Sequence, residues 1–117
     1  MSTAQSKGAH GEQFVEYMLK EMKLDYRKCT GIACAGDFNI YLPKETIIIE
    51  VKNYTNQIPA KEIKKFERDL QINEIHRGIM ISLNTDFANY RPPKNEIFFL
   101  YGNAVYGDFI KLIESLI

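Results

Sequence analysis

Residues 36–54 read GDFNIYLPKETIIIEVKNY, and this stretch decides the fold. Polar and apolar side chains alternate along 37–42, and a second, largely aliphatic strand pattern follows along 46–52. A Pro-Lys-Glu turn separates the two segments, so we predict a β-hairpin. Because side chains alternate between the two faces of a strand, Glu50 and Lys52 should point to the same side of the second strand, opposite to its isoleucines.

Asp37 begins the first strand of this hairpin, and Glu50 lies near the end of the second. Antiparallel pairing should bring the two carboxylates together, where they could share one hard divalent cation. A coordinated water becomes a better nucleophile, and the Lys52 ammonium could orient that water or stabilise charge that builds on a phosphate. Glu12, on a predicted helix, is a further carboxylate for a second cation or a metal-bound water. The plain alternative is that Glu50 and Lys52 are two solvated charges on an edge strand.

The bulk composition is that of an ordinary globular protein. The chain has 117 residues, of which 45% are hydrophobic and 26% charged, and its formal net charge is zero. We expect a single domain over 1–117, with 1–7 as a flexible arm. Zero net charge argues against strong non-specific binding of nucleic acid, although it allows a local basic patch. Two cysteines, Cys29 and Cys34, are too few for a four-thiolate zinc site, and we expect them to be thiols.

The location of the protein is predicted from two features of the sequence. The first ten residues are polar and small, unlike a secretory signal. No apolar run approaches the length of a membrane-spanning helix. We therefore expect no membrane association and an intracellular location, which would be cytoplasmic or, in a eukaryotic or viral setting, nuclear or at a viral replication site.

Helical and strand patterns alternate along the rest of the chain. We predict helices at 8–22, 59–73 and 107–117, and strands at 24–33, 37–42, 46–52, 78–83 and 96–101. The middle helix joins two of these strands, which should therefore be parallel neighbours. On the first helix, Phe14, Met18 and Met22 repeat every four positions and predict an inner stripe. The order αβββαββα predicts an α/β fold with a mixed five-stranded sheet.

The Gly36-Asp37 pair, the Glu50-Val51-Lys52 triplet and the helical segment Lys7-Gly8-Ala9-His10-Gly11-Glu12 occur together. This combination resembles the PD-(D/E)xK nuclease superfamily, with Asp37, Glu50 and Lys52 as its triad. With the helical Glu12 it is similar to archaeal Holliday-junction resolvases and Mrr-type restriction endonucleases, over about residues 7–83. One departure from the family pattern is visible, because Gly36 stands where the name of the superfamily has proline.

The resemblance implies a restriction-endonuclease-like fold, a three-layer α/β/α sandwich around a central mixed sheet. It also implies Mg²⁺-dependent hydrolysis of DNA phosphodiesters, with Mn²⁺ as an alternative cation. The metal ligands implied are Asp37, Glu50, the backbone carbonyl of Val51, and Glu12 for a second or water-mediated ion.

Several residues are candidates for contacts with DNA. The candidates are Lys7, His10, Tyr54, Lys61, Lys64 and Lys65. Tyr54 could stack on a base, and the lysines of the middle helix could line a DNA-facing side. Each candidate also has a structural interpretation: the histidine as a solvated residue, the tyrosine as a packing residue, and the lysines as a solvated helical face with internal charge pairs.

These patterns together predict a metal-dependent DNA endonuclease that acts on branched or repair and recombination intermediates. The alternatives are a catalytically weak DNA-binding module with a nuclease fold, or a subunit of a larger nuclease or helicase assembly. A small chain with zero net charge needs DNA affinity from elsewhere, so a homodimer or a partner protein is expected.

Overall fold

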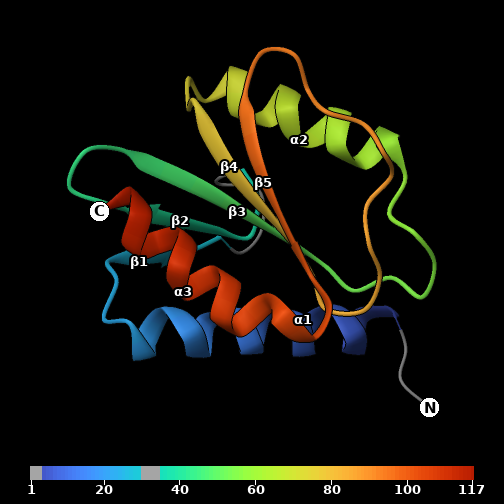
Figure 1. Ribbon diagram of the computed structural model, residues 1–117, viewed down its shortest axis with the longest axis horizontal. Helices are drawn as coiled ribbons and strands as arrows, with labels where there is room; N and C mark the ends of the chain where they lie inside the picture. Colours follow the sequence, from blue (N-terminus) through green and yellow to red (C-terminus); the bar gives the residue numbers. More distant parts are fainter. Residues whose placement is uncertain (1–3, 30–34) are drawn as a thin grey trace.

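The computed structural model describes residues 4–29 and 35–117, with only the backbone described over 4–9. Figure 1 shows the described elements, which follow the predicted order. They are helix α1 (Ala4–Glu21), strands β1 (Tyr26–Lys28), β2 (Phe38–Tyr41) and β3 (Thr46–Lys52), helix α2 (Ala60–Ile72), strands β4 (Arg77–Ser82) and β5 (Glu96–Tyr101), a 3₁₀ turn (Gly102–Ala104), and helix α3 (Val105–Leu116).

The five described strands form one mixed sheet in the order β1-β2-β3-β4-β5. The first three strands are antiparallel, which confirms the predicted hairpin, and β3, β4 and β5 are parallel. Strand β3 is therefore the central strand, with an antiparallel neighbour on one side and a parallel one on the other. The predicted pairing across the α2 crossover is confirmed.

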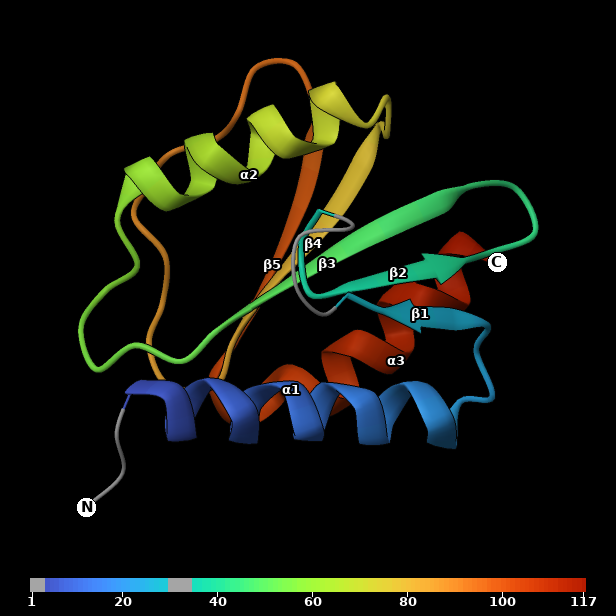
Figure 2. The same ribbon diagram turned by 180° about the vertical axis from the view of Figure 1, so that it is seen from behind.

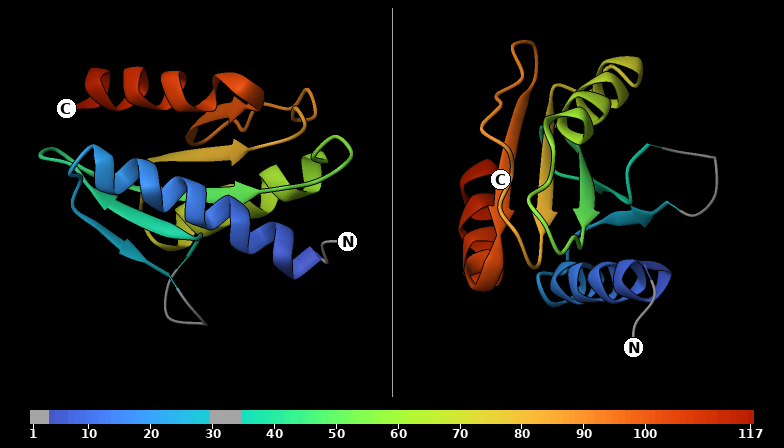
Figure 3. Two further views of the ribbon diagram at one scale, coloured as in Figure 1. Left: turned by 90° about the horizontal axis from the view of Figure 1, so that it is seen from below. Right: turned by 90° about the vertical axis from the view of Figure 1, so that its right-hand side faces the viewer.

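Helices cover both faces of this sheet and complete three layers (Figure 3). Strand β3 alternates between the two faces, so Ile47 and Ile49 join the core under α1 and α3, and Ile48 joins the core under α2. On α2 the inner side chains are Ile63, Phe66 and Leu70. The restriction-endonuclease-like α/β/α architecture is confirmed. The polar residues that follow Ile48 on its face, Glu50 and Lys52, consequently lie on the α2 side.

Three expectations about the first third of the chain were wrong. Helix α1 begins at Ala4 and not at residue 8, so residues 4–7 are helical, and the rest of the predicted arm, 1–3, lies outside the described residues. Strand β1 ends at Lys28, five residues before the predicted end, and 30–34 lie outside the described residues. Phe14 is 38% exposed, whereas Val15, Met18 and Leu19 are buried. The reason is that α1 faces the sheet through the line of residues 11, 15 and 19, which places Phe14 at its border.

Cys29 corrects a further expectation, because it is disulfide-bonded and not a thiol. The other cysteine of the chain, Cys34, falls within residues 30–34, outside the described residues. Within the described residues, no helix is both long enough and apolar enough to cross a bilayer.

Candidate active site at the end of β3

The hairpin fixes the position of the Asp37 carboxylate. In the register of β2 and β3, Phe38 pairs with Ile49, and the Asp37 N–H donates to the Ile49 carbonyl oxygen at 2.8 Å. The Val51 N–H then donates to Asp37 Oδ2 at 2.7 Å. This short, charge-assisted bond holds the carboxylate at the end of β3. Asp37 thus lies beside Glu50, as the hairpin spacing predicted.

Gly36 is required by the backbone at the entry to this hairpin. Its φ angle is +68°, in the region that side chains disfavour. A Cβ atom at this position would lie 2.4 Å from Cγ2 of Ile48 and 2.9 Å from the Ile49 carbonyl oxygen. Proline holds φ near −65° and could not adopt this conformation. The departure from the superfamily pattern is therefore a consequence of how this chain enters β2.

The Glu50 carboxyl has a raised pKa of about 7. Burial is the main cause, and the negative charge of Asp37 and a hydrogen bond with it add to the effect, whereas the Lys52 ammonium opposes it. Two negative charges held this close together leave a place for positive charge. A divalent cation between them would relieve the repulsion, and carboxylate oxygens are the donors that Mg²⁺ prefers. The donor set therefore fits a hard cation.

The described residues contain no cluster of three or more His, Cys, Asp or Glu side chains that could hold an ion. A cation at Asp37 and Glu50 would therefore draw its remaining ligands from waters and backbone carbonyls, among which Val51 is the predicted one. Mg²⁺ commonly keeps several waters and takes one or two carboxylates. The pair is thus compatible with Mg²⁺, and it supplies too few donors for an ion that is held by protein ligands alone.

Helix α1 runs past β3 (Figure 2), and its Gly11 lies next to Val51 near the end of that strand. A Cβ atom at Gly11 would lie 3.1 Å from Cγ1 of Val51, so a glycine allows this contact. Glu12 is half-buried, and its pKa is raised first by burial and then by the negative charge of Asp37. The structure therefore places Glu12 within electrostatic range of Asp37, although it does not complete a three-residue ligand cluster with the pair.

Lys52 lies between two carboxylates on the α2 side of the sheet. Its Nζ atom is 3.6 Å from Glu50 Oε2 and 3.6 Å from Glu62 Oε2. Burial is the largest influence on the Lys52 pKa and would lower it, but the charges of Glu50 and Glu62 outweigh it and the pKa is raised. The side chain therefore stays an ammonium at neutral pH, as a group that acts on phosphate charge must.

Sequence comparison identifies the family. A family model described as Restriction endonuclease, Mrr_cat, matches residues 4–89. The chain belongs to this family. The Mrr-type, PD-(D/E)xK identification made from the sequence is confirmed.

The known structures support the fold of this Mrr-type domain. The crystal structure of AF1548, a protein of unknown function, is similar at a TM-score of 0.61 with 13% sequence identity. The alignment covers 86% of this chain and 65% of that one, so this chain spans less than two thirds of the length of AF1548. No curated protein shows significant sequence similarity to the chain.

Glu62 is a residue of this restriction-endonuclease-family site that the sequence interpretation did not identify. It is half-buried and contacts Lys52. The Tyr54 hydroxyl donates to Glu62 Oε1 at 3.1 Å. The Glu62 pKa is lowered: burial, the largest influence, would raise it, but Lys52 and the hydrogen bond from Tyr54 prevail. The spacing of the sequence offered a signal, because Glu62 lies four residues before Phe66 and Asp69 three residues after it, and residues so spaced share one flank of a helix.

The candidate DNA contacts are placed unevenly around the site. Lys61, Lys64 and Lys65 are exposed along α2, and the Lys64 ammonium lies 5.2 Å from the centre of the Tyr90 ring. His10 is exposed on α1, and the side chain of Lys7 is outside the described part of the structure. Tyr54 is half-buried with its hydroxyl bound to Glu62. These residues remain predicted DNA contacts.

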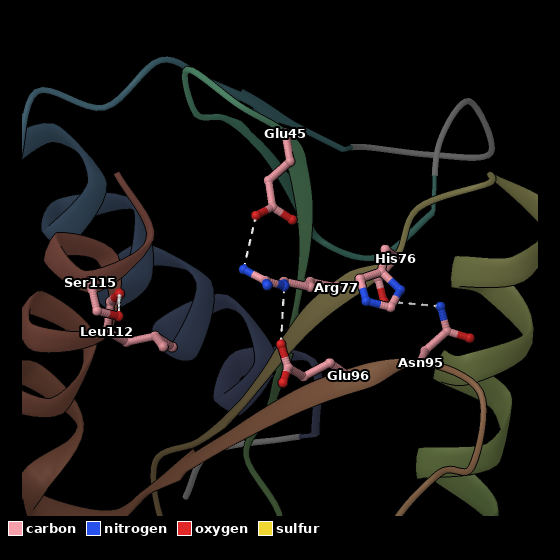
Figure 4. A network of polar contacts seen from close by, with 7 residues as sticks. All are labelled: Glu45, His76, Arg77, Asn95, Glu96, Leu112 and Ser115. Carbon is pink, nitrogen blue, oxygen red and sulfur yellow. Dashed lines mark hydrogen bonds and ion pairs between the residues drawn. The ribbon is translucent and has the colours of Figure 1, made fainter.

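At the other end of the sheet, where β3, β4 and β5 begin, the Arg77 guanidinium lies between two carboxylates (Figure 4). Arg77 Nη1 donates to Glu45 Oε2 at 3.1 Å, and Arg77 Nε lies 3.0 Å from Glu96 Oε1. This cluster joins the starts of three strands.

Proposed function

We propose that the chain is a metal-dependent DNA endonuclease whose active site is the end of β3. The observation that carries the proposal is the meeting of Asp37, Glu50 and Lys52 in a family of restriction endonucleases. Asp37 is held by a backbone N–H, and the Glu50 pKa of about 7 reflects first its burial and then its repulsion by the Asp37 carboxylate. That repulsion is what a bound cation would remove.

Each residue has a role in this proposal. Asp37, Glu50 and the Val51 carbonyl would hold Mg²⁺, or Mn²⁺ in its place. The ion, when bound, would supply a water of lowered pKa as nucleophile and a Lewis acid for the phosphate. The Lys52 ammonium would orient the attacking water or stabilise the charge that develops on the phosphate. Glu12 would act through a metal-bound water or a second ion, because among the described residues no third carboxylate joins the pair directly.

DNA would approach the site across the start of α2. Lys61 and Lys65 are exposed there, and the positive charge of Lys65 reaches Glu62. Four phosphate contacts or fewer give weak binding at physiological salt, since affinity grows with the number of phosphates neutralised. With zero net charge, the chain would gain affinity from a homodimer or from a larger nuclease or helicase assembly. Branched or repair and recombination intermediates are the proposed substrates.

A panel of branched, duplex and single-stranded DNAs, incubated with Mg²⁺ or Mn²⁺, tests the proposal. Wild-type protein should cleave at least one form, and Asp37→Ala should abolish both the cleavage and the calorimetric signal of Mn²⁺ binding. Unchanged Mn²⁺ binding in Asp37→Ala would disprove the metal site. If the wild-type protein binds DNA but cuts no form with either metal, the chain is a DNA-binding module with a nuclease fold.

A further inference from the structure

The two carboxylates around Lys52 belong to different parts of the chain. Glu50 is on the same strand as Lys52, whereas Glu62 comes from the first turn of α2, across a loop. Both oxygens lie 3.6 Å from Nζ, and the lysine side chain is only 18% exposed. Since α2 packs on the sheet through Ile63 and Phe66, its first turn is held at a fixed distance from β3.

Glu62 is itself held in place by Tyr54. One of its oxygens, Oε1, accepts the tyrosine hydroxyl, and the other, Oε2, faces the Lys52 ammonium. The Tyr54 ring also faces this ammonium, at 6.0 Å from the ring centre. Lys52 is therefore bounded by two carboxylates and an aromatic ring, and two of these three groups are linked to each other by a hydrogen bond.

We infer that Glu62 is a positioning residue, which holds the Lys52 ammonium at the reacting phosphate. The inference rests on the proposed function, in which Glu50 is a metal ligand. A cation that takes up the charge of Glu50 weakens the attraction of Glu50 for Lys52 and repels the ammonium. Glu62 Oε1 already accepts the Tyr54 hydroxyl, and Glu62 forms no three-carboxylate group with Asp37 and Glu50 in the described residues, so its attraction for Lys52 persists. Lysine has a flexible four-carbon stem, and a second anchor is what keeps its charge at one place.

The variant Glu62→Gln tests this role, with Glu45→Gln as its matched control. Glu45 likewise pairs with a cationic side chain, Arg77, at the far end of the sheet. The Glu45 side chain is 25% exposed, against 18% for Glu62. Single-turnover cleavage by Glu62→Gln should be slower by about tenfold to hundredfold, because a misplaced group loses its effect on the transition state. DNA affinity in Ca²⁺ and Mn²⁺ affinity should stay within about twofold of wild type. Glu45→Gln should cut at the wild-type rate.

Two further variants separate positioning from general stability. Glu62→Asp keeps the charge on a shorter side chain and should restore part of the rate. The double variant Lys52→Ala/Glu62→Gln should be no slower than Lys52→Ala alone, since Glu62 acts through Lys52. A further loss in the double variant would show that Glu62 acts on the substrate by itself and would overturn the inference.

A measurement without DNA completes the test. In ¹⁵N-lysine-labelled protein with Mg²⁺, the Lys52 Nζ should become more mobile in Glu62→Gln and remain unchanged in Glu45→Gln. An unchanged Nζ, or wild-type cleavage by Glu62→Gln, overturns the inference while the nuclease proposal stands. Wild-type protein that cuts no DNA overturns the proposed function, and the positioning role is lost with it.

Discussion

The two ends of the central sheet carry the same motif, one cation between two carboxylates, and differ in how tightly it is closed. At the start of the parallel strands, Arg77 contacts its partners at 3.1 and 3.0 Å. At the end of β3, Lys52 stands 3.6 Å from each partner. The tighter cluster is the more exposed one, with Arg77 at 32% against 18% for Lys52.

Under the proposed function, this difference is one between a cluster of structural ion pairs and a site for a metal ion. The planar guanidinium of Arg77 divides its donors between Glu45 and Glu96 and joins the starts of three strands. Around Lys52 the balance is different, because Asp37 adds a further carboxylate beside Glu50. The end of β3 is thus left with excess negative charge in a buried place, which is costly unless a cation or a proton compensates it.

Replacing Lys52 or Arg77 by a neutral side chain should give the largest contrast between the two ends of the sheet. Lys52→Met is expected to reduce cleavage by about a thousandfold, since a charge that acts mainly in the transition state is lost. DNA affinity in Ca²⁺ should fall by no more than the equivalent of one phosphate contact. Single-turnover rates and filter binding measure the two effects. A loss of binding equal to the loss of rate would show that Lys52 binds DNA and takes no part in the chemistry.

The excess negative charge should also appear in the pH dependence of stability. The Glu50 pKa is about 7 in the folded protein and 4.5 without its surroundings. The folded state therefore holds this proton more tightly, and the stability that the group contributes below pH 4.5 is lost as the pH rises through 7. The full shift corresponds to about 3 kcal/mol.

Urea unfolding in EDTA, at pH 5 and at pH 8, measures this effect. Wild-type protein should lose up to about 3 kcal/mol relative to Glu50→Gln between the two pH values. Mn²⁺ at pH 8 should stabilise the wild-type protein and leave Glu50→Gln unaffected. Glu96→Gln, in the Arg77 cluster, is the control and should follow the wild-type profile. Parallel profiles for wild type and Glu50→Gln would mean that the Glu50 pKa is not raised in the folded protein.

At the opposite end of the sheet, replacing Arg77 should lower stability and leave cleavage unchanged. Arg77→Met is expected to lower the free energy of unfolding by about 1–2 kcal/mol, because the half-buried Glu45 and the more exposed Glu96 both lose their partner. Its cleavage rate should stay within about twofold of wild type, since the cluster lies at the start of the parallel strands and the proposed site at the end of β3. Thermal unfolding and the cleavage assay measure both. A variant that loses activity without losing stability would remove the distinction between the two ends.

The sequence predicted those features that depend on local periodicity and short connections. The hairpin, the bounds of β3 and β5, and the face shared by Glu50 and Lys52 follow from alternation and from one turn. Features that depend on how elements pack were not predicted. The role of Glu62 requires knowing which side of α2 meets β3, and Phe14 was misplaced because the close contact at Gly11 sets the rotation of α1. Arg77 joins three strand starts that are distant in sequence, so no local pattern reveals it.

The smallest expected effect concerns α1, where two glutamates one turn apart offer a matched pair. Glu12 faces Asp37, whereas Glu16 accepts the Tyr26 hydroxyl at 2.7 Å and lies 3.7 Å from Lys28. Glu12→Gln should slow cleavage by about tenfold or less and leave stability within about 0.5 kcal/mol. Glu16→Gln should keep the rate and lose about 1 kcal/mol, because it weakens a charged hydrogen bond.

Cleavage rates and thermal unfolding of these two variants decide whether the proposed active site includes Glu12 of α1. A carboxylate that acts on a metal-bound water influences the rate without adding to packing, so only Glu12 should separate activity from stability. If both variants keep full activity, Glu12 is a half-buried carboxylate with no part in the reaction, and the site is confined to the hairpin and the start of α2. If Glu16→Gln slows cleavage as much as Glu12→Gln, the effect comes from a shift of the whole helix over the end of β3.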